Sequence, residues 1–252
     1  MSPWLEAAIV FAAGVGAGTI NTVVGSGTLI TFPVLLSIGL PSLTANVTNT
    51  LGLVPGSFMG AYGYRNQLAG QRPLVLRLGL ASVGGALLGA GLLLALPPGA
   101  FKAIVPALVA LALVLVVAGP AVNRRLGAGR AGRDDTPRPT LWWSTLGSGT
   151  YGGYFGAAQG VLLMGLLGAL HGGDVQRNNA IKNVLTGTVN LVAAVVFVVV
   201  ARPNWTYAGL IAAGSAVGGV IGAKVGRRLS PWRLRTLIVV VGLVAIIKLL
   251  IS

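Results

Sequence analysis

The chain has 252 residues, of which 54% are hydrophobic and only 9% are charged, and its mean hydropathy is +0.84. Soluble domains carry about 25% charged residues, so this composition indicates an all-α protein that crosses a membrane several times. The net charge of +14 does not indicate nucleic-acid binding, because the basic residues lie in short loops between apolar segments. With no cysteine, one histidine and four carboxylates, we expect no disulfide, metal or other cofactor.

Ten apolar segments follow one another along the chain. Eight are long enough to approach the length of about 20 residues that spans the hydrocarbon core, whereas two are short. Each short segment directly follows a long one, and we expect it to be one limb of a broken helix or bent hairpin. The segments are 5–24, 28–40 (short), 44–64, 74–96, 103–122, 142–158, 160–170 (short), 180–201, 206–226 and 234–251.

Lys and Arg residues gather near three loops, 65–73, 123–140 and 227–233. The positive-inside rule places all three on the cytoplasmic side, and this works only if each long and short pair counts as two limbs. The chain is then two inverted-topology repeats, 1–122 and 141–252, joined by the basic cytoplasmic linker 123–140. The alternative is two parallel four-helix halves, in which the third basic loop breaks the rule.

A weak internal repeat relates the region 13–52 to the region 149–187, and both copies carry polar residues within apolar segments. The alignment needs one inserted residue. Polar groups at bilayer depth are costly, so a duplicated polar patch predicts a functional site. The aligned pairs are Gly27 and Gly160, Gly39 and Gly173, Ala45 and Asn179, Thr48 and Lys182, and Asn49 and Asn183.

Lys182 is the main candidate for contact with an anion, because it is a cation within a long apolar segment. The alternatives are that its side chain snorkels to the headgroup level or pairs with Asp174. Arg177 is a candidate for an anion entrance, or else forms a surface ion pair with Asp174. His171 is either a proton-coupling group or an interfacial histidine.

Further candidates are amides, hydroxyls and glycine breaks. Amide and hydroxyl groups donate hydrogen bonds to anion oxygens, although in membranes they also serve as bonds between helices. Glycine permits a sharp turn and exposes backbone N–H groups to a ligand. The expected donors are Asn46, Thr48, Asn49, Asn179 and Asn183, the expected break residues are Gly25, Gly27, Gln159 and Gly160, and Asn21 lies one turn before the first break.

The glycine-rich stretch GAGTINTVVGSGTLITFPVLLSIGLP, followed by Ala45-x-x-Thr48 and repeated in the second half, resembles the TauE/SafE sulfite exporter family. This family is also called the toluene sulfonate uptake permease family. The resemblance implies a bacterial inner-membrane transporter for sulfite, sulfonates or other small anions. The chain departs from the family pattern where the substrate is expected to bind. The departures are the reduced glycine runs Gly25-Ser26-Gly27-Thr28 and Gln159-Gly160, and the pairs Thr48-Asn49 and Lys182-Asn183.

We therefore expect a secondary transporter for a small anion such as sulfite or an organosulfonate, with alternating access between the repeats. An anion-selective channel and a permease for a non-sulfur organic anion are the alternatives. A scaffold is disfavoured because the longest loop is about 18 residues, and an enzyme because no carboxylate pair or nucleophile with its base is present. The expected partners are the anion and the lipid bilayer, and the glycine-rich region 214–226 serves either internal packing or a homodimer.

Overall fold

The computed structural model describes residues 2–127, 139–172 and 174–225, together with the isolated positions 236, 239–240 and 243. Within these residues the chain is helical, with nine α-helices, one short 3-10 helix and no strand. Most of the linker 123–140, nearly all of the predicted segment 234–251, and Gly173 lie outside the described residues.

Each predicted apolar segment within the described ranges corresponds to one helix. The limits agree most closely for α7, which begins one residue before the predicted 160–170, and least closely for α5, which begins five residues before and ends five residues after the predicted 103–122. The helices are α1 (Pro3–Val23), α2 (Thr28–Ser37), α3 (Ser42–Gly63), the 3-10 helix η1 (Arg65–Leu68), α4 (Arg72–Ala95), α5 (Pro98–Gly127), α6 (Pro139–Tyr154), α7 (Gln159–Leu170), α8 (Val175–Val200) and α9 (Trp205–Val225).

Five of the described helices are long and apolar enough to cross a membrane, namely α1, α4, α5, α8 and α9. The helix α3 has 22 residues but contains a polar run of Asn and Thr, and α6 has only 16 residues. The helices α2 and α7 are short and apolar, as predicted for the second limbs of the two broken pairs.

Both helical breaks depend on residues with a left-handed backbone. Gly25, between α1 and α2, has φ +90°. Between α6 and α7 the turn uses Gly156 at φ 76° and Ala158 at φ 59°. The second turn therefore lies just before Gln159 and Gly160, which form the first turn of α7.

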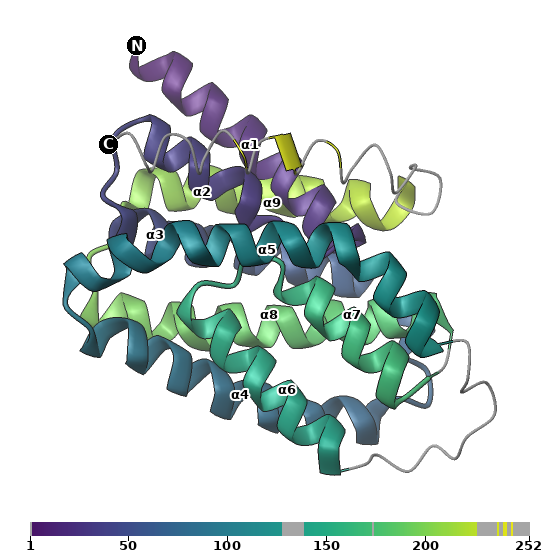
Figure 1. Cartoon of the computed structure of the whole chain (residues 1–252). Helices are drawn as coiled ribbons and strands as arrows, with labels where there is room; N and C mark the ends of the chain where they lie inside the picture. Colours follow the sequence, from purple (N-terminus) through teal and green to yellow (C-terminus); the bar gives the residue numbers. More distant parts are fainter. Residues whose placement is uncertain are drawn as a thin grey trace.

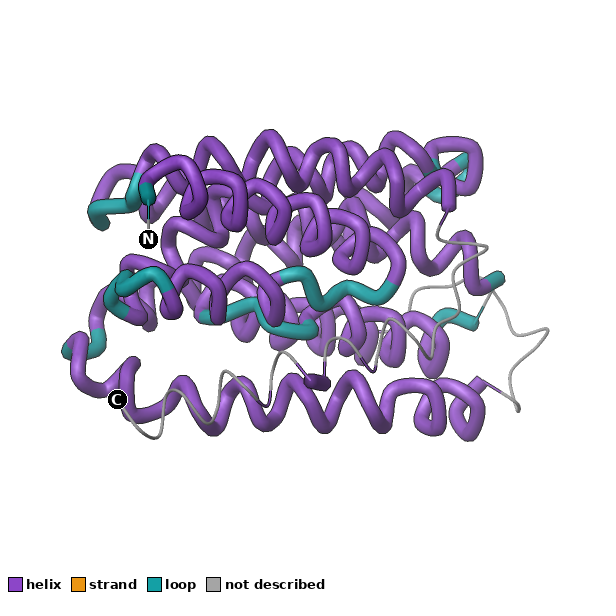
Figure 2. The backbone as a smooth tube through the Cα atoms, turned by 90° about the horizontal axis from the view of Figure 1, so that it is seen from above, coloured by secondary structure: helices purple, strands orange, loops and turns teal. Residues whose placement is uncertain are grey.

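The helices pack in pairs that relate the two halves of the chain. The helix α1, which opens the first half, packs against α9, and α6, which opens the second half, packs against α4. In the same way α3 packs on α9 and α8 packs on α4, while α3 and α8 contact each other. Figures 1 and 2 show the long helices lying side by side in a single bundle. Each half therefore packs against helices of the other.

The glycines of region 214–226 account for part of this close packing. Gly214 and Gly218 lie against the backbone of α1, and Gly219 lies against the backbone of α3. Small residues of this kind let helices approach closely in a membrane. Within this chain the region therefore serves internal packing.

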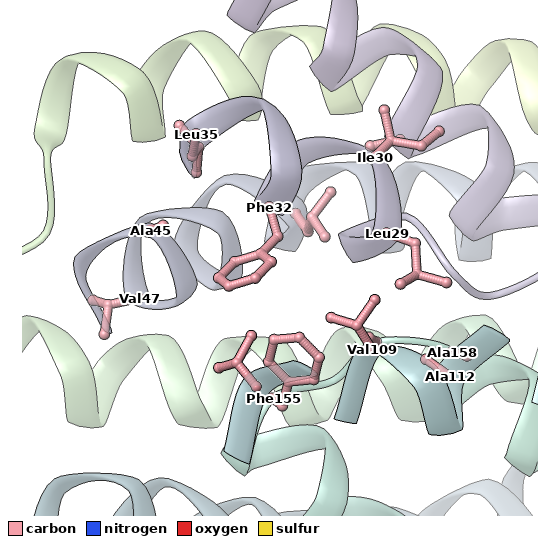
Figure 3. Packing of buried hydrophobic residues seen from close by; sticks show 14 of the residues in the cluster. Leu29, Ile30, Phe32, Leu35, Ala45, Val47, Val109, Ala112, Phe155 and Ala158 are labelled. Carbon is pink, nitrogen blue, oxygen red and sulfur yellow. The ribbon is translucent and has the colours of Figure 1, made fainter. Parts of the chain in front are cut away.

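A cluster of aromatic and aliphatic side chains holds the short helix α2 against the second break. The Phe32 ring of α2 meets the Phe155 ring edge to face, with centroids 5.2 Å apart. Phe101 of α5 packs on the same Phe155 ring at 6.1 Å. Figure 3 shows this packing, in which side chains of α2 face those of α5 and the second break. The core thus surrounds both helix breaks.

Basic residues gather at one end of the bundle. At this end Tyr64, Ala180 and Ala223 are buried together, which brings the end of α3, the start of α8 and the end of α9 close to one another. At the opposite end the Tyr207 hydroxyl donates to Glu6 at 2.9 Å, which joins the starts of α9 and α1. The first end holds the basic residues just after α3, at the start of α4, at the start of α8 and at the end of α9, namely Arg65, Arg72, Arg77, Arg177 and Lys224. The opposite end holds Lys102 in the first turns of α5 and Arg202 just before α9.

Candidate functional site

The two helix breaks touch each other directly. The backbone N–H of Gly160, in the first turn of α7, donates to the carbonyl of Gly25 at 3.0 Å. A Cβ atom on either glycine would collide with the backbone of the other. Glycine is therefore required at both positions for the halves to meet backbone to backbone. Gly27 lies beside this contact as the N-cap residue of α2.

Lys182 of α8 lies at the end of α1, beside the first break. Its side chain is fully buried, and its Nζ donates to the carbonyls of Asn21 at 2.9 Å and Thr22 at 3.0 Å. The neighbouring Asn183 amide also donates to the Thr22 carbonyl, at 3.2 Å. These carbonyls belong to the last turn of α1, where a helix carries unpaired oxygens and a partial negative charge. The ammonium group thus caps the broken end of α1.

The structure contradicts both alternatives for Lys182. Snorkelling is wrong, because no part of the side chain reaches the surface. A pair with Asp174 is also wrong, because that exposed carboxylate caps the start of α8 by accepting from the N–H groups of Gln176 and Arg177 at 2.9 and 3.3 Å. Among the described residues, Lys182 is the one charged side chain that is buried.

The second break is capped in a similar way from the other half. The Asn46 side chain of α3 donates to the carbonyl of Tyr154, the last residue of α6, at 3.0 Å. Tyr154 follows Asn21 by 133 residues, the same separation that relates Gly160 to Gly27. Equivalent carbonyls at the two breaks therefore accept a hydrogen bond from a helix of the opposite half. At the second break the donor is the Asn46 amide of α3, and at the first break it is the Lys182 ammonium group of α8.

Two of the predicted donors are engaged elsewhere. The Asn49 amide donates to the Thr28 hydroxyl at 3.2 Å and accepts from the Thr31 hydroxyl, so it joins α3 to α2. The Thr48 hydroxyl accepts from the backbone N–H of Asn204 at 2.9 Å and holds the loop before α9. Both side chains are buried, and their hydrogen bonds connect one part of the protein to another.

Several buried polar atoms at the two breaks and on α3 and α8 have no hydrogen-bond partner among the described residues. An unpaired buried polar group costs about 1–3 kcal/mol, so each of these atoms indicates a position for water or a ligand. These atoms are Thr22 Oγ1, Ser26 Oγ, Asn46 Oδ1, Tyr154 OH, Gln159 Nε2, Asn179 Oδ1 and Asn183 Oδ1. The predicted site residues Asn46, Gln159, Asn179 and Asn183 thus retain free capacity for hydrogen bonds.

Sequence reasoning missed several residues of this region, among them Thr22, whose carbonyl accepts from Lys182 and Asn183. Ser57 of α3 accepts from the Asn21 amide at 3.1 Å and from the Asn190 amide at 3.4 Å, so it connects α1, α3 and α8. Nothing in its glycine-rich surroundings distinguishes it from a packing residue. Tyr154 was also missed, although the repeat alignment pairs it with Asn21 and contained the signal that could have found it.

The remaining candidates lie towards the basic end, away from the contact of the breaks. His171 is the residue at which α7 ends, and Arg177 lies in the first turn of α8, partly buried. The Asn178 amide donates to the Gly172 carbonyl at 2.7 Å and closes the connection between these helices. Within the described ranges, no three residues among His, Asp and Glu come together as a metal site.

Comparison with known proteins finds relatives that are named as probable membrane transporters. The family described as Sulfite exporter TauE/SafE matches residues 10–249. The chain is 28% identical over 246 residues to "Probable membrane transporter protein ORF9" of Sinorhizobium sp, covering 96% of this chain and 92% of the relative. It is 26% identical over 249 residues to a "Probable membrane transporter protein" of Haemophilus influenzae, covering 96% and 93%. It is 25% identical over 256 residues to "Probable membrane transporter protein YfcA" of Escherichia coli K12, covering 99% and 91%. No solved structure gives a significant match.

Proposed function

Since the chain belongs to the TauE/SafE family of membrane transporters, we propose that it carries a small anion, such as sulfite or an organosulfonate, which binds beside the two helix breaks. The observation that supports this most directly is the buried charge of Lys182, which has backbone carbonyls as its partners. Carbonyl dipoles supply only part of the negative charge that a buried cation needs, and an anion would supply the rest.

The unpaired donors around the breaks support the same site. Anion oxygens accept hydrogen bonds, and the Gln159 amide nitrogen, together with the hydroxyls of Ser26 and Tyr154, is buried without a partner among the described residues. An oxyanion with several oxygens accepts from more than one of these groups at once, which suits sulfite and sulfonates. These donors come from both breaks, so the bound anion would contact both halves of the chain.

We also propose alternating access between two inverted repeats, with eight long crossings and two short limbs. The paired packing of α1 on α9 and α6 on α4 supports a two-fold relation of the halves. The gathering of basic residues at one end of the helices supports a cytoplasmic location for that end. In this arrangement one half rocks against the other, and the breaks lie where the halves meet.

Uptake of labelled sulfite and of a small sulfonate into proteoliposomes tests this proposal. We expect saturable flux for the wild type above empty liposomes, and loss of flux in Lys182→Gln in medium that contains choline instead of Na⁺. The exposed Lys102→Gln is the matched control, because it removes the same charge outside the site and should retain flux.

The form of the flux separates the alternatives. Linear, non-saturating movement would identify an anion channel. Saturable flux that carboxylates inhibit and sulfonates do not would identify a permease for a non-sulfur organic anion. Retention of full flux in Lys182→Gln, with the variant folded, would refute the role of the buried charge.

A further inference from the structure

We propose that the Lys182 ammonium occupies the position of a coupling cation, so that anion movement by this chain does not require Na⁺. The position has the chemistry of a cation site. Transporters with interrupted helices bind Na⁺ through unwound carbonyls and the C-terminal ends of half-helices. Here Nζ of Lys182 lies 2.9 and 3.0 Å from two carbonyls in the last turn of α1, those of Asn21 and Thr22.

The ammonium is held firmly in this position. Lys182 belongs to α8 and bonds to α1, and the adjacent Asn183 amide donates to the same Thr22 carbonyl at 3.2 Å. The Thr186 hydroxyl donates to the Lys182 carbonyl at 2.9 Å, one turn along α8. The whole side chain is buried. A cation tethered in this way cannot leave with the substrate, as a coupling ion does.

The carboxylates of the described residues do not serve a mobile cation at this position. Glu6 is bonded to the Tyr207 hydroxyl at the opposite end of the bundle, at 2.9 Å. Asp174 is exposed and caps the start of α8. Apart from Lys182 the site is therefore built from neutral groups, and its positive charge comes from the chain itself.

The two breaks differ in a way that supports a single cation position. Thr48 occupies the place in the first repeat that Lys182 occupies in the second. The carbonyl of Tyr154 at the second break accepts from the neutral Asn46 amide instead of an ammonium group. The cation is thus a property of one break, and a change at one residue is sufficient to remove it.

Replacing Lys182 by threonine, the residue of the other repeat, should convert the tethered cation into a binding site for a free one. The substitution vacates the position next to the carbonyls of Asn21 and Thr22. Asn183, whose amide nitrogen already donates to the Thr22 carbonyl, has its Oδ1 atom buried without a partner among the described residues, and the shorter threonine side chain leaves room for an ion and its water. Neutral oxygens grouped in this way are suitable ligands for Na⁺ or Li⁺.

The first test is the thermal stability of the purified full chain in NaCl, LiCl, KCl and choline chloride. We expect the wild type and the exposed control Lys102→Thr to be indifferent to the cation. Lys182→Thr should gain about 3–6 °C in Tm at a Na⁺ concentration ten times the dissociation constant. This readout needs no substrate, so it decides the proposal even if the transported anion has been assigned wrongly. A folded Lys182→Thr that responds to none of these cations would overturn it.

The second test rests on the proposed anion transport and uses the wild type. Labelled anion flux into proteoliposomes should be the same in Na⁺ and in choline, whereas Lys182→Thr should show flux in Na⁺ and little in choline. If Lys182→Thr cannot be purified, the wild type alone decides, since a saturable Na⁺ requirement of its flux would overturn the proposal. Absence of any flux in the wild type would count against the proposed function and leave the stability result to decide this inference.

Discussion

Replacement of Gly25 by alanine should separate the two helix breaks. Gly25 has φ +90°, a conformation that costs an L-residue about 1–2 kcal/mol. An added Cβ would also collide with the backbone of Gly160, which donates to the Gly25 carbonyl at 3.0 Å. Overpacking of this kind costs about 1–3 kcal/mol. The substitution should therefore lower the free energy of unfolding by about 2–5 kcal/mol.

Alanine substitutions at three further glycines separate the cost of the left-handed backbone from the cost of the collision. Gly39 has φ +96° but open space around it, so Gly39→Ala carries only the backbone cost of about 1–2 kcal/mol. Gly160 is helical, so Gly160→Ala carries only the collision. Gly147 in α6 is helical and has open space, and alanine there should be neutral or stabilising, by up to about 1 kcal/mol.

Thermal unfolding of the four alanine variants in one detergent measures these differences. For a chain of this size 1 kcal/mol corresponds to about 2–4 °C in Tm, so Gly39→Ala should lose about 2–8 °C and Gly25→Ala about 4–20 °C. Gly25→Ala and Gly160→Ala should also lose anion flux, because the site is built around their contact. If Gly25→Ala is no more harmful than Gly39→Ala, and Gly160→Ala resembles Gly147→Ala, the two breaks do not touch in the protein.

Three hydrogen-bonded residues give further predictions, each measured by thermal unfolding together with flux. Asn46→Ala removes the donor to the Tyr154 carbonyl and should lower the free energy of unfolding by about 0.6–1.7 kcal/mol. It should lower anion flux by more than this loss of stability explains, and unchanged flux would refute a place for Asn46 at the site. Ser215→Ala removes the bonds to the Gly52 carbonyl, at 2.7 Å, and to a backbone N–H of α3, and should cost about 1–3 kcal/mol with KM unchanged. Asn49→Leu should likewise lower Tm and leave KM unchanged, because its amide bonds to α2, and a raised KM would restore it as a substrate ligand.

The sequence was sufficient to predict the helices because their signals are local. Apolar segments interrupted by glycine and basic loops mark helix limits without reference to the rest of the chain. The short limbs α2 and α7 were found in this way, as was the presence of a break at Gly25. The second turn is displaced from Gln159 because its left-handed residues are Gly156 and Ala158, and alanine carries no signal for such a conformation.

The partners of the site residues were not predictable in the same way. Asn46 and Asn49 are the same residue type one helical turn apart, yet one caps α6 and the other bonds to α2. Lys182 contacts residues about 160 positions away along the chain. Local periodicity places a side chain on a face of its own helix, but it does not state which helix covers that face. These contacts depend on how the halves pack, which no single segment determines.

The capping of each break by the opposite half joins stability to the proposed mechanism. The end of α1 is closed by Lys182 and Asn183 of the second half, and the end of α6 is closed by Asn46 of the first. Rocking of one half against the other would therefore disturb the carbonyls at both breaks. An anion that pairs with the Lys182 ammonium would lower the free energy needed to disturb the first break. It would have no such effect at the second break, where the donor is the neutral Asn46 amide. The single cation thus provides a physical reason for substrate binding to favour one arrangement of the halves over the other.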